Sequence, residues 1–437
     1  MANPRETVLS ALVAMRRNGA WSDGVLKDLI KRDGLDSRDA ALATRICGGV
    51  LQNLLLCDFY ISSFCSLKID KLQPFVRDIL RIGVYQIVFM DRIPNNAAVN
   101  EAVNSVKKHA NPRAAGMVNG VLRSLCRSLD NLPEPEQEEY LSVKYSHPRW
   151  LCDELANSVG NEELEPLLAA NNVSPMTVAQ INTTKFSADE AKELLSADGV
   201  EFQPHRWMKD CLLLKDTGSI ESLTAFQTGA ITIQDAAAKL AVAVSGVKPG
   251  DTVIDGCAAP GGKTFAAAIQ MRDKGRVLSF DIHQHKINLI SAGAERLGLE
   301  CIEAKTGNGK QPDETLYGIA DVVLADVPCS GFGVIRKKPE IRYKKQQDAE
   351  NMPDIQLDIL SGLSKCVKPG GVLLYSTCTV LKQENEQVVE AFLKAHTEFA
   401  AEEFDTPAGN AKNGMLTLLP HLHDTDGFFI CKLRKKV

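Results

Sequence analysis

The second half of the chain repeats one local pattern, in which an apolar run is followed by a glycine turn and then by an amphipathic helix. The pattern first appears in residues 251–271 (DTVIDGCAAPGGKTFAAAIQM) and returns in residues 276–298. Two more apolar runs follow, in residues 320–331 (ADVVLADVPCSG) and 370–380 (GGVLLYSTCTV). Because parallel strands need a crossover connection, this alternation predicts a parallel sheet with helices on both faces.

Polar or reactive residues stand where these apolar runs end. Asp255, Asp281 and Asp326 close three of the runs, and Cys378 follows the fourth. Ligands of open parallel sheets bind beyond the carboxyl ends of the strands. Cys329, in the stretch DVPCS, stands just after Asp326. We therefore expect the two thiols to share a site at this edge of the sheet.

A chain of 437 residues is too long for one ordinary core and predicts two or three domains. Residues 1–130 show apolar positions at helical spacing, which predicts an all-α domain. Residues 131–139 (NLPEPEQEE) predict a linker, and the mixed pattern that continues to residue 229 predicts a small α+β module. Residues 230–437 are then the α/β domain.

The charge of the chain is unevenly distributed. The net charge of −5 does not by itself indicate a nucleic-acid-binding protein. Residues 1–130, however, contain 18 Lys and Arg against 12 Asp and Glu. A basic first domain on an acidic body can bind a polyanion locally.

The cysteines and the apolar runs indicate the compartment. The twelve cysteines include no CxxC pair, which favours reduced thiols over a disulfide framework or a zinc site. No apolar run approaches the roughly 18 residues that span a bilayer, and the N-terminus lacks the pattern of a signal peptide. We expect a cytoplasmic protein with no membrane partner and no metal.

The stretch DGCAAPGGKT (255–264) predicts a ligand-binding turn between a strand and a helix. Its glycines permit close approach of the backbone to a ligand, and the N–H groups at a helix start suit a carboxylate or a phosphate. It is not a Walker P-loop, because Cys257 occupies the position of that motif's first glycine. An ordinary strand-to-helix turn is the alternative. Asp281, at the end of the next strand, suits the two ribose hydroxyls of an adenosine.

Three stretches, DGCAAPGGKT, DVPCSG and STCT, resemble the signature motifs of S-adenosylmethionine-dependent RNA 5-methylcytosine methyltransferases. With a helical domain ahead of them, the chain resembles the bacterial ribosomal small-subunit RNA methyltransferase B family (RsmB, Sun or Fmu). The resemblance implies an all-α NusB-like RNA-binding domain, a small α+β module and a Rossmann-like methyltransferase domain. It also implies S-adenosyl-L-methionine as cofactor and 16S ribosomal RNA as partner, with the cytosine at conventional position 967 as target.

The two cysteines have a chemical use in such a reaction. Carbon 5 of cytosine is a poor nucleophile until a thiolate adds to carbon 6, and a thiolate is both strongly nucleophilic and a good leaving group. The resemblance implies that Cys378 forms this bond, that Cys329 assists breakdown of the adduct, and that Asp326 hydrogen-bonds the cytosine. DNA methyltransferases place the nucleophile in the PC motif and lack the second cysteine. A buried structural role is the alternative for either thiol.

The cofactor contacts implied by the resemblance include one departure from the family pattern. The family normally has Gly-Asp-Gly where this chain has Asn308 between two glycines, and the amide oxygen of Asn308 can still accept a hydrogen bond, without charge. The implied contacts are Cys257, Ala258, Ala259, Pro260, Gly261, Gly262, Lys263, Asp281, Asn308 and Asp326.

Some alternatives stay open at this stage. The same chemistry could act on transfer RNA or on another ribosomal cytosine, and a NusB-like domain could instead belong to a non-catalytic RNA-binding or antitermination factor. A metabolic dehydrogenase is disfavoured, because it would leave the paired cysteines without a use. The basic run at residues 336–345 (RKKPEIRYKK) predicts contact with RNA phosphates. We expect the protein to be monomeric.

Overall fold

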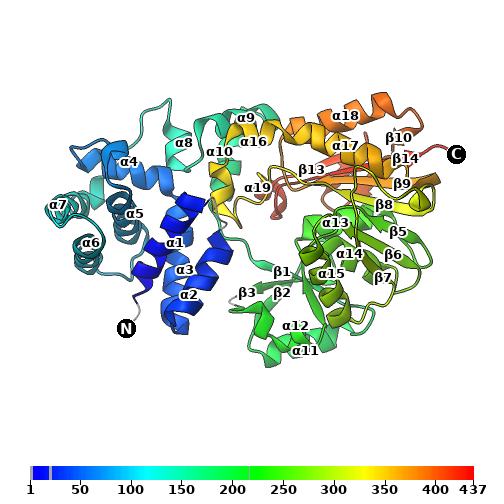
Figure 1. The fold of residues 1–437 in the computed structure, drawn as a ribbon, viewed down its shortest axis with the longest axis horizontal. Coiled ribbons are helices and arrows are strands. Elements are labelled where there is room, and N and C mark those ends of the chain that lie inside the picture. Colours follow the sequence, from blue (N-terminus) through cyan, green and yellow to red (C-terminus); the bar gives the residue numbers. More distant parts are fainter. Residues whose placement is uncertain (1–2, 19–21, 216) are drawn as a thin grey trace. The chain divides into compact units, whose positions relative to one another are not determined.

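The computed structural model describes residues 3–18, 22–215 and 217–437 of the chain. The chain divides into two compact units. The first contains residues 1–172 together with the short excursion 337–344, and the second contains residues 173–336 and 345–437. Figure 1 colours the chain from its N-terminus in blue to its C-terminus in red.

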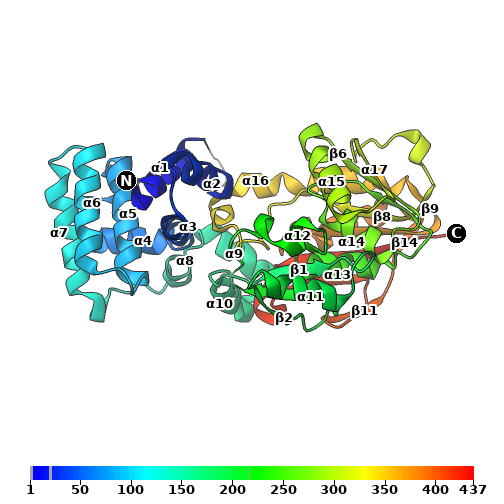
Figure 2. The same ribbon diagram turned by 90° about the horizontal axis from the view of Figure 1, so that it is seen from below.

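The first unit is helical, as predicted for residues 1–130, and its helices continue through residues 140–170, which the sequence predicts to belong to the small α+β module. Its core consists of aliphatic residues that recur at helical spacing, such as Ile79, Leu80 and Val84 on one helix. Figures 1 and 2 show α5, α6 and α7 side by side. The helices are α1 (Pro4–Asn18), α2 (Ser22–Asp33), α3 (Ser37–Gln52), α4 (Leu54–Phe64), α5 (Pro74–Phe89), α6 (Asn95–His109), α7 (Ala114–Arg127), α8 (Tyr140–Lys144), α9 (Arg149–Val159) and α10 (Asn161–Ala170).

Among the residues that the structure describes, no single helix is long and apolar enough to cross a membrane. The bent pair α3 and α4, taken together, has the length and the apolar composition of a membrane-crossing segment.

The second unit begins with a four-stranded sheet in the order β2-β3-β1-β4. All of its pairings are antiparallel. A capping box formed by Ser187 and Glu190 starts the main helix of this module. Its elements are β1 (Thr177–Ile181), α11 (Ala188–Ala197), β2 (Glu201–Pro204), β3 (Cys211–Lys215), α12 (Thr224–Gln227) and β4 (Ile231–Ile233).

The remainder of the second unit is built on an eight-stranded sheet with the order β10-β14-β9-β8-β5-β6-β7, with β13 paired to β14. Its strands are β5 (Thr252–Asp255), β6 (Arg276–Asp281), β7 (Ile302–Thr306), β8 (Ala320–Asp326), β9 (Val367–Thr377), β10 (Phe399–Ala401), β13 (Met415–Leu418) and β14 (Phe428–Lys435). Beside it lies a two-stranded sheet of β11 (Phe404–Thr406) and β12 (Gly409–Ala411).

Helices cover both faces of this sheet, as the alternation of strands and helices predicts (Figure 1). Adjacent residues of one strand point to opposite faces, so Val253 packs with the first group of helices and Ile254 with the second. The first group is α13 (Ala236–Ser245), α14 (Gly262–Gln270) and α15 (Gln284–Leu297). The second is α17 (Met352–Ser364) and α18 (Glu386–Ala395), and the short helices α16 (Gln346–Glu350) and α19 (Pro420–His423) complete the unit.

The prediction of a parallel sheet is right for five strands and wrong for one edge. Strands β7, β6, β5, β8 and β9 pair in parallel. Strand β14 runs antiparallel to β9, and β10 and β13 pair antiparallel with β14. Strand β14 is reached from β13 through the short helix α19, a connection that suits antiparallel pairing and lacks the long crossover helix that parallel strands need.

Candidate active site

The carboxyl ends of the parallel strands gather the polar residues that the sequence places there. Asp255, Asp281 and Asp326 are the last residues of β5, β6 and β8. Cys378 directly follows β9, and Cys329 lies three residues after the end of β8. Because β9, β8, β5 and β6 are neighbours and parallel, these residues meet at one edge of the sheet, as predicted.

The two cysteines of this edge face each other. The Sγ atoms of Cys329 and Cys378 are 3.1 Å apart, and both residues are free and partly exposed. The hydrogen bond with Cys378 and then burial raise the pKa of the Cys329 thiol well above its usual value. Cys329 therefore holds its proton at neutral pH and can donate a hydrogen bond to a thiolate on Cys378.

Asp326 is held by two side chains beside the thiols. Its Oδ2 lies 2.7 Å from Nζ of Lys263, and its Oδ1 accepts a hydrogen bond of 2.9 Å from Ser376. Lys263 belongs to the first turn of α14 and is largely buried, with its Nζ over the ring of Phe428. An ion pair thus joins the glycine-rich turn to the strand end that carries Cys329.

The glycine-rich turn after β5 has a backbone that requires glycine. Gly261 has φ +114°, and a Cβ atom there would lie 2.5 Å from the ring of Phe265. The first hydrogen bond of α14 runs from the N–H of Phe265 to the carbonyl of Gly261. The N–H groups of residues 262–264 therefore have no partner within the helix and suit an anionic group.

Asp255 is fully buried beneath this turn. Its Oδ2 accepts a hydrogen bond of 2.8 Å from Thr264, whose hydroxyl also lies 3.0 Å from that of Ser279. Burial raises the pKa of Asp255 to about 7, against the effect of the Thr264 hydrogen bond. The hydrogen bond to Thr264 therefore ties β5 to α14.

This buried carboxyl predicts a pH dependence of stability. Between a pH near 4 and one near 7, folded Asp255 retains a proton that the unfolded chain has lost. The free energy of unfolding should therefore fall as pH rises through this window, by on the order of 2–4 kcal/mol. Unfolding followed at a series of pH values, for the protein and for Asp255→Asn, should show a gentler slope in the variant. Equal slopes would contradict the assignment.

Asp281 and Asn308 lie at the ends of the next two strands. Asp281 accepts a hydrogen bond of 3.0 Å from the N–H of His283, and its other oxygen lies 3.5 Å from Nζ of Lys286. Ile282, immediately after it, is 64% exposed. A carboxylate beside an exposed apolar side chain suits a ribose with its base. Asn308 follows β7 and accepts a hydrogen bond from the N–H of Lys310.

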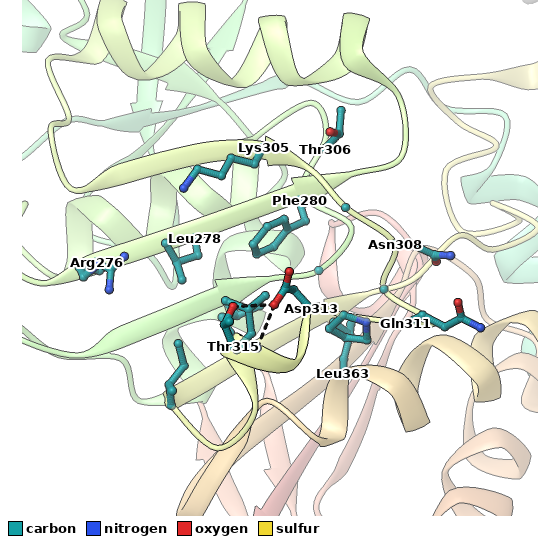
Figure 3. A pocket seen from close by; sticks show the side chains of 17 residues that line it. Arg276, Leu278, Phe280, Lys305, Thr306, Asn308, Gln311, Asp313, Thr315 and Leu363 are labelled. Carbon is teal, nitrogen blue, oxygen red and sulfur yellow. Dashed lines mark hydrogen bonds between the residues drawn. The ribbon is translucent and has the colours of Figure 1, made fainter.

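Asn308 also borders a cavity of about 600 Å³, shown in Figure 3. The cavity is lined by Leu278 and Phe280, which point to the face of the sheet covered by α17. No α-helix connects β7 to β8, and only the short turn η4 (Glu314–Leu316) lies there. Of the residues that the sequence assigns to the cofactor, Asn308 alone lines this cavity.

Gln234 is a residue of this site that the sequence did not suggest. It follows β4, is 7% exposed, and its side-chain amide has no hydrogen-bond partner among the described residues. Its Nε2 lies 3.4 Å from where a Cβ of Gly262 would be. A buried polar group normally has a partner, so a donor and an acceptor remain available beside the glycine-rich turn. The residues around the turn therefore fit a ligand with charged amino and carboxylate groups.

The basic run at residues 336–345 does not offer the predicted phosphate contacts at its two arginines. Arg342 is fully buried in the first unit, where its Nη1 donates to the carbonyls of Gln52 and Tyr145 and to Oδ1 of Asn172 at 2.8–3.0 Å. Burial lowers the pKa of Arg342 to about 10. Arg336, in the second unit, pairs with Asp426 at 3.1 Å. The prediction is wrong for these two arginines, because a count of charges does not reveal which side chains are buried.

The described residues contain no cluster of side chains suited to a metal ion. In residues 3–18, 22–215 and 217–437, no group of three or more His, Cys, Asp or Glu side chains is arranged to hold a metal ion.

Comparison with known proteins agrees with this architecture. The model of the 16S rRNA methyltransferase RsmB/F family matches residues 243–434, that of the NusB family matches residues 2–127, and a ferredoxin-like domain of RsmF/B-like methyltransferases matches residues 147–221. Strands β1, β2 and β3 of the four-stranded sheet lie within the match to the ferredoxin-like domain.

Two relatives and a solved structure match the chain over nearly its whole length. A probable ribosomal RNA small subunit methyltransferase B of Bacillus subtilis is 38% identical over 99% of this chain and 98% of the relative. The ribosomal RNA small subunit methyltransferase B of Yersinia pseudotuberculosis is 31% identical over 99% of both chains. The crystal structure of the protein PH0851 has a TM-score of 0.83 at 27% identity, covering 100% of this chain and 99% of that one. The chain therefore belongs to the RsmB/F family of ribosomal RNA methyltransferases, with a NusB domain ahead of its ferredoxin-like and methyltransferase domains.

Proposed function

We propose that this protein methylates carbon 5 of one cytosine in 16S ribosomal RNA through a covalent bond between the base and Cys378. The observation that carries the proposal is the pair of thiols, Cys329 and Cys378, 3.1 Å apart at the ends of two adjacent parallel strands. A target base must leave its stack to reach such a site, as in other enzymes that act on bases.

The proposed steps balance as an addition followed by an elimination. The thiolate of Cys378 adds to carbon 6, and the electron pair of the ring's 5,6 double bond makes carbon 5 nucleophilic. Carbon 5 takes the methyl group, which comes from S-adenosyl-L-methionine. A base then removes the proton of carbon 5, the double bond returns and the thiolate of Cys378 leaves.

The hydrogen bond between the thiols supports a nucleophilic role for Cys378 and a role as base for Cys329. While Cys378 is a thiolate, the S–H of Cys329 stabilises it, and this bond is the main reason that the pKa of Cys329 is raised. Once the sulfur of Cys378 is bonded to carbon, that cause is removed and Cys329 loses its proton more readily. Cys329 is then suited to accept the proton of carbon 5.

Asp326 is placed to hold the cytosine during these steps. One of its oxygens is shared with Lys263 and the other with Ser376, so the carboxylate has a fixed orientation beside the thiols. It can accept a hydrogen bond from the exocyclic amine of cytosine, or from N3 when that nitrogen is protonated. Lys263 neutralises the carboxylate and links it to the cofactor turn.

The residues assigned to S-adenosyl-L-methionine divide by chemistry. The free N–H groups at the start of α14 suit the carboxylate of the cofactor, and the amide of Gln234 supplies one donor and one acceptor for its amino-acid end. Asp281 suits the ribose hydroxyls, Ile282 offers an apolar surface to the adenine, and Asn308 can accept from an exocyclic amine.

Replacing Gly261 with alanine should weaken cofactor binding by at least about tenfold. The left-handed backbone costs a residue with a side chain about 1–2 kcal/mol, and the new Cβ would meet the ring of Phe265. Isothermal titration with S-adenosyl-L-methionine measures the change. Gly120→Ala is a matched control, because Gly120 lies within α7 with no atom near its would-be Cβ. Unchanged affinity in Gly261→Ala would contradict the assignment of the turn.

The proposed function is tested by methyl transfer to a small-subunit ribosomal RNA transcript free of protein, with the modified cytosines mapped by bisulfite sequencing. A single protected cytosine is the expected result. Activity on transfer RNA alone would keep the chemistry and overturn the substrate. The absence of methylation on either RNA, with the cofactor bound, would favour a non-catalytic RNA-binding role for the NusB domain.

A further inference from the structure

Two consecutive buried residues, Glu384 and Asn385, lie behind the two cysteine-bearing loops. Both are 0% exposed, and they stand where the turn η6 (Lys382–Glu384) meets α18. Neither has a part in the steps described above. The hydroxyl of Tyr375 donates a hydrogen bond of 2.6 Å to the carbonyl of Glu384, which fixes the backbone of the pair against β9.

Glu384 holds the loop of Cys329 directly on one side of the cysteine and through Gln356 on the other. Its Oε2 accepts a hydrogen bond of 2.8 Å from the N–H of Ser330, the residue after Cys329. The same oxygen accepts from Nε2 of Gln356 at 2.8 Å, and this nitrogen also donates to the carbonyl of Pro328 at 3.0 Å. Gln356 is itself 0% exposed.

Asn385 holds the loop of Cys378 directly, through the residues before and after the cysteine. Its Oδ1 accepts a hydrogen bond of 2.5 Å from the hydroxyl of Thr377, the residue before Cys378. Its Nδ2 donates to the carbonyl of Thr379, the residue after Cys378, at 3.0 Å. A further bond of 3.0 Å between the hydroxyls of Ser330 and Thr379 joins the two loops directly.

We propose that Glu384 and Asn385 are positioning residues that set the spacing of the two thiols, with Glu384 serving Cys329 and Asn385 serving Cys378. The inference rests on the proposed function, because it links Glu384 to release of the adduct and Asn385 to formation of the adduct. Backbone hydrogen bonds join the two loops from Val327 to the carbonyl of Ser376 at 3.2 Å and from Gly333 to the carbonyl of Cys378 at 2.9 Å. The adjacent side chains of Glu384 and Asn385 add bonds to the residues that flank each cysteine, and so help to set the distance between the sulfurs.

The different contacts of Glu384 and Asn385 predict different defects for their alanine variants. Glu384→Ala leaves the nucleophile in place but frees the loop of Cys329, so it should accumulate the covalent protein–RNA adduct. Asn385→Ala frees the loop of Cys378, so it should form little adduct. Turnover should fall by about 10- to 100-fold in each, the loss expected from a misplacement near 1 Å. A role in packing alone would lower turnover in both without separating the two steps.

The conservative variant gives a second readout. The bonds from the N–H of Ser330 and from Gln356 to the carboxyl of Glu384 end on one oxygen, and burial raises the pKa of this carboxyl. A glutamine at this position can accept the same two bonds through its amide oxygen. Glu384→Gln should therefore restore turnover to near that of the unchanged protein. Gln356→Ala removes the link from Glu384 to the carbonyl of Pro328. It should therefore accumulate less adduct than Glu384→Ala, and it provides a test even if Glu384→Ala folds poorly.

The experiment uses the full chain, S-adenosyl-L-methionine and radiolabelled small-subunit ribosomal RNA transcript, and it measures turnover and the adduct that survives a denaturing gel. Cys329→Ala and Cys378→Ala provide the two reference patterns. Glu386→Ala is the matched control, because Glu386 is a partly buried glutamate two residues after Glu384 that has no bond to either cysteine loop among the described residues. Unfolding midpoints and cofactor affinity show that each variant is folded.

The outcomes separate the inference from the proposed function. Adduct with Cys329→Ala and Glu384→Ala, and little with Cys378→Ala and Asn385→Ala, supports both. Adduct with Cys329→Ala but equal, adduct-free losses in Glu384→Ala and Asn385→Ala would overturn the inference and leave the proposed function standing. A lack of adduct with Cys329→Ala would overturn the proposed roles of the cysteines, and the inference with them.

Discussion

Replacing Cys378 with alanine should abolish methyl transfer, with turnover falling by at least about 1000-fold. Without a thiolate at this position, carbon 5 of the base stays a poor nucleophile and the first step of the proposed reaction cannot occur. Transfer of a tritiated methyl group from S-adenosyl-L-methionine to the RNA transcript measures the loss. The variant should also form no covalent adduct on a denaturing gel.

A matched cysteine shows whether the loss is specific to this thiol. Cys301 is partly exposed, belongs to the same unit and lies away from the strand ends that carry Cys329 and Cys378. Cys301→Ala should retain turnover within about twofold, since substitutions away from such features have small effects. Substantial methylation by Cys378→Ala would remove the nucleophile assignment.

Replacing Cys329 with alanine should trap the reaction after methyl transfer. Cys378 can still add to the base and carbon 5 can still take the methyl group, but the base that removes the proton of carbon 5 is missing. Turnover should fall by at least about 100-fold, within the range attributed to general base catalysis. A stable band of protein joined to RNA should appear in the presence of S-adenosyl-L-methionine.

The content of that band distinguishes release from addition. If Cys329 acts in release, a tritiated methyl group should be found in the trapped band, close to one per protein chain. A loss of activity with no adduct would show that Cys329 is needed earlier, as the partner that stabilises the thiolate of Cys378. A variant with ordinary turnover would exclude both roles.

The parts of this site that could be predicted from the sequence follow from one repeated pattern. Each apolar run ends in a residue of distinct chemistry, so Asp255, Asp281, Asp326 and Cys378 could be placed at strand ends before any contact was known. Parallel pairing then brings those ends to one edge. The local pattern places each residue at a strand end, and the parallel topology brings these ends together, so the prediction that they meet at one edge is confirmed.

The supporting residues could not be predicted in the same way. Glu384 and Asn385 lie in the stretch KQENEQ, whose composition is typical of a solvated helix start. Only the packed structure shows both to be buried and bonded to residues more than fifty positions away or on a neighbouring loop. Gln234 is similar, because a lone glutamine before a helix carries no signal of burial. The function of such residues depends on tertiary contacts that no local period encodes.

The excursion of residues 337–344 affects how this chain can be divided. These residues belong to the first unit although the chain on both sides of them belongs to the second. A fragment beginning at residue 173 would keep Arg342 and Tyr343 but lose the carbonyls of Gln52 and Leu51 that receive their hydrogen bonds. In such a fragment Arg342 would be solvated by water, and the segment 337–344 would lose the packing and the hydrogen bonds that place it. The NusB domain is for this reason not a detachable module, and recombination that exchanged it would have to exchange a piece of the catalytic half as well.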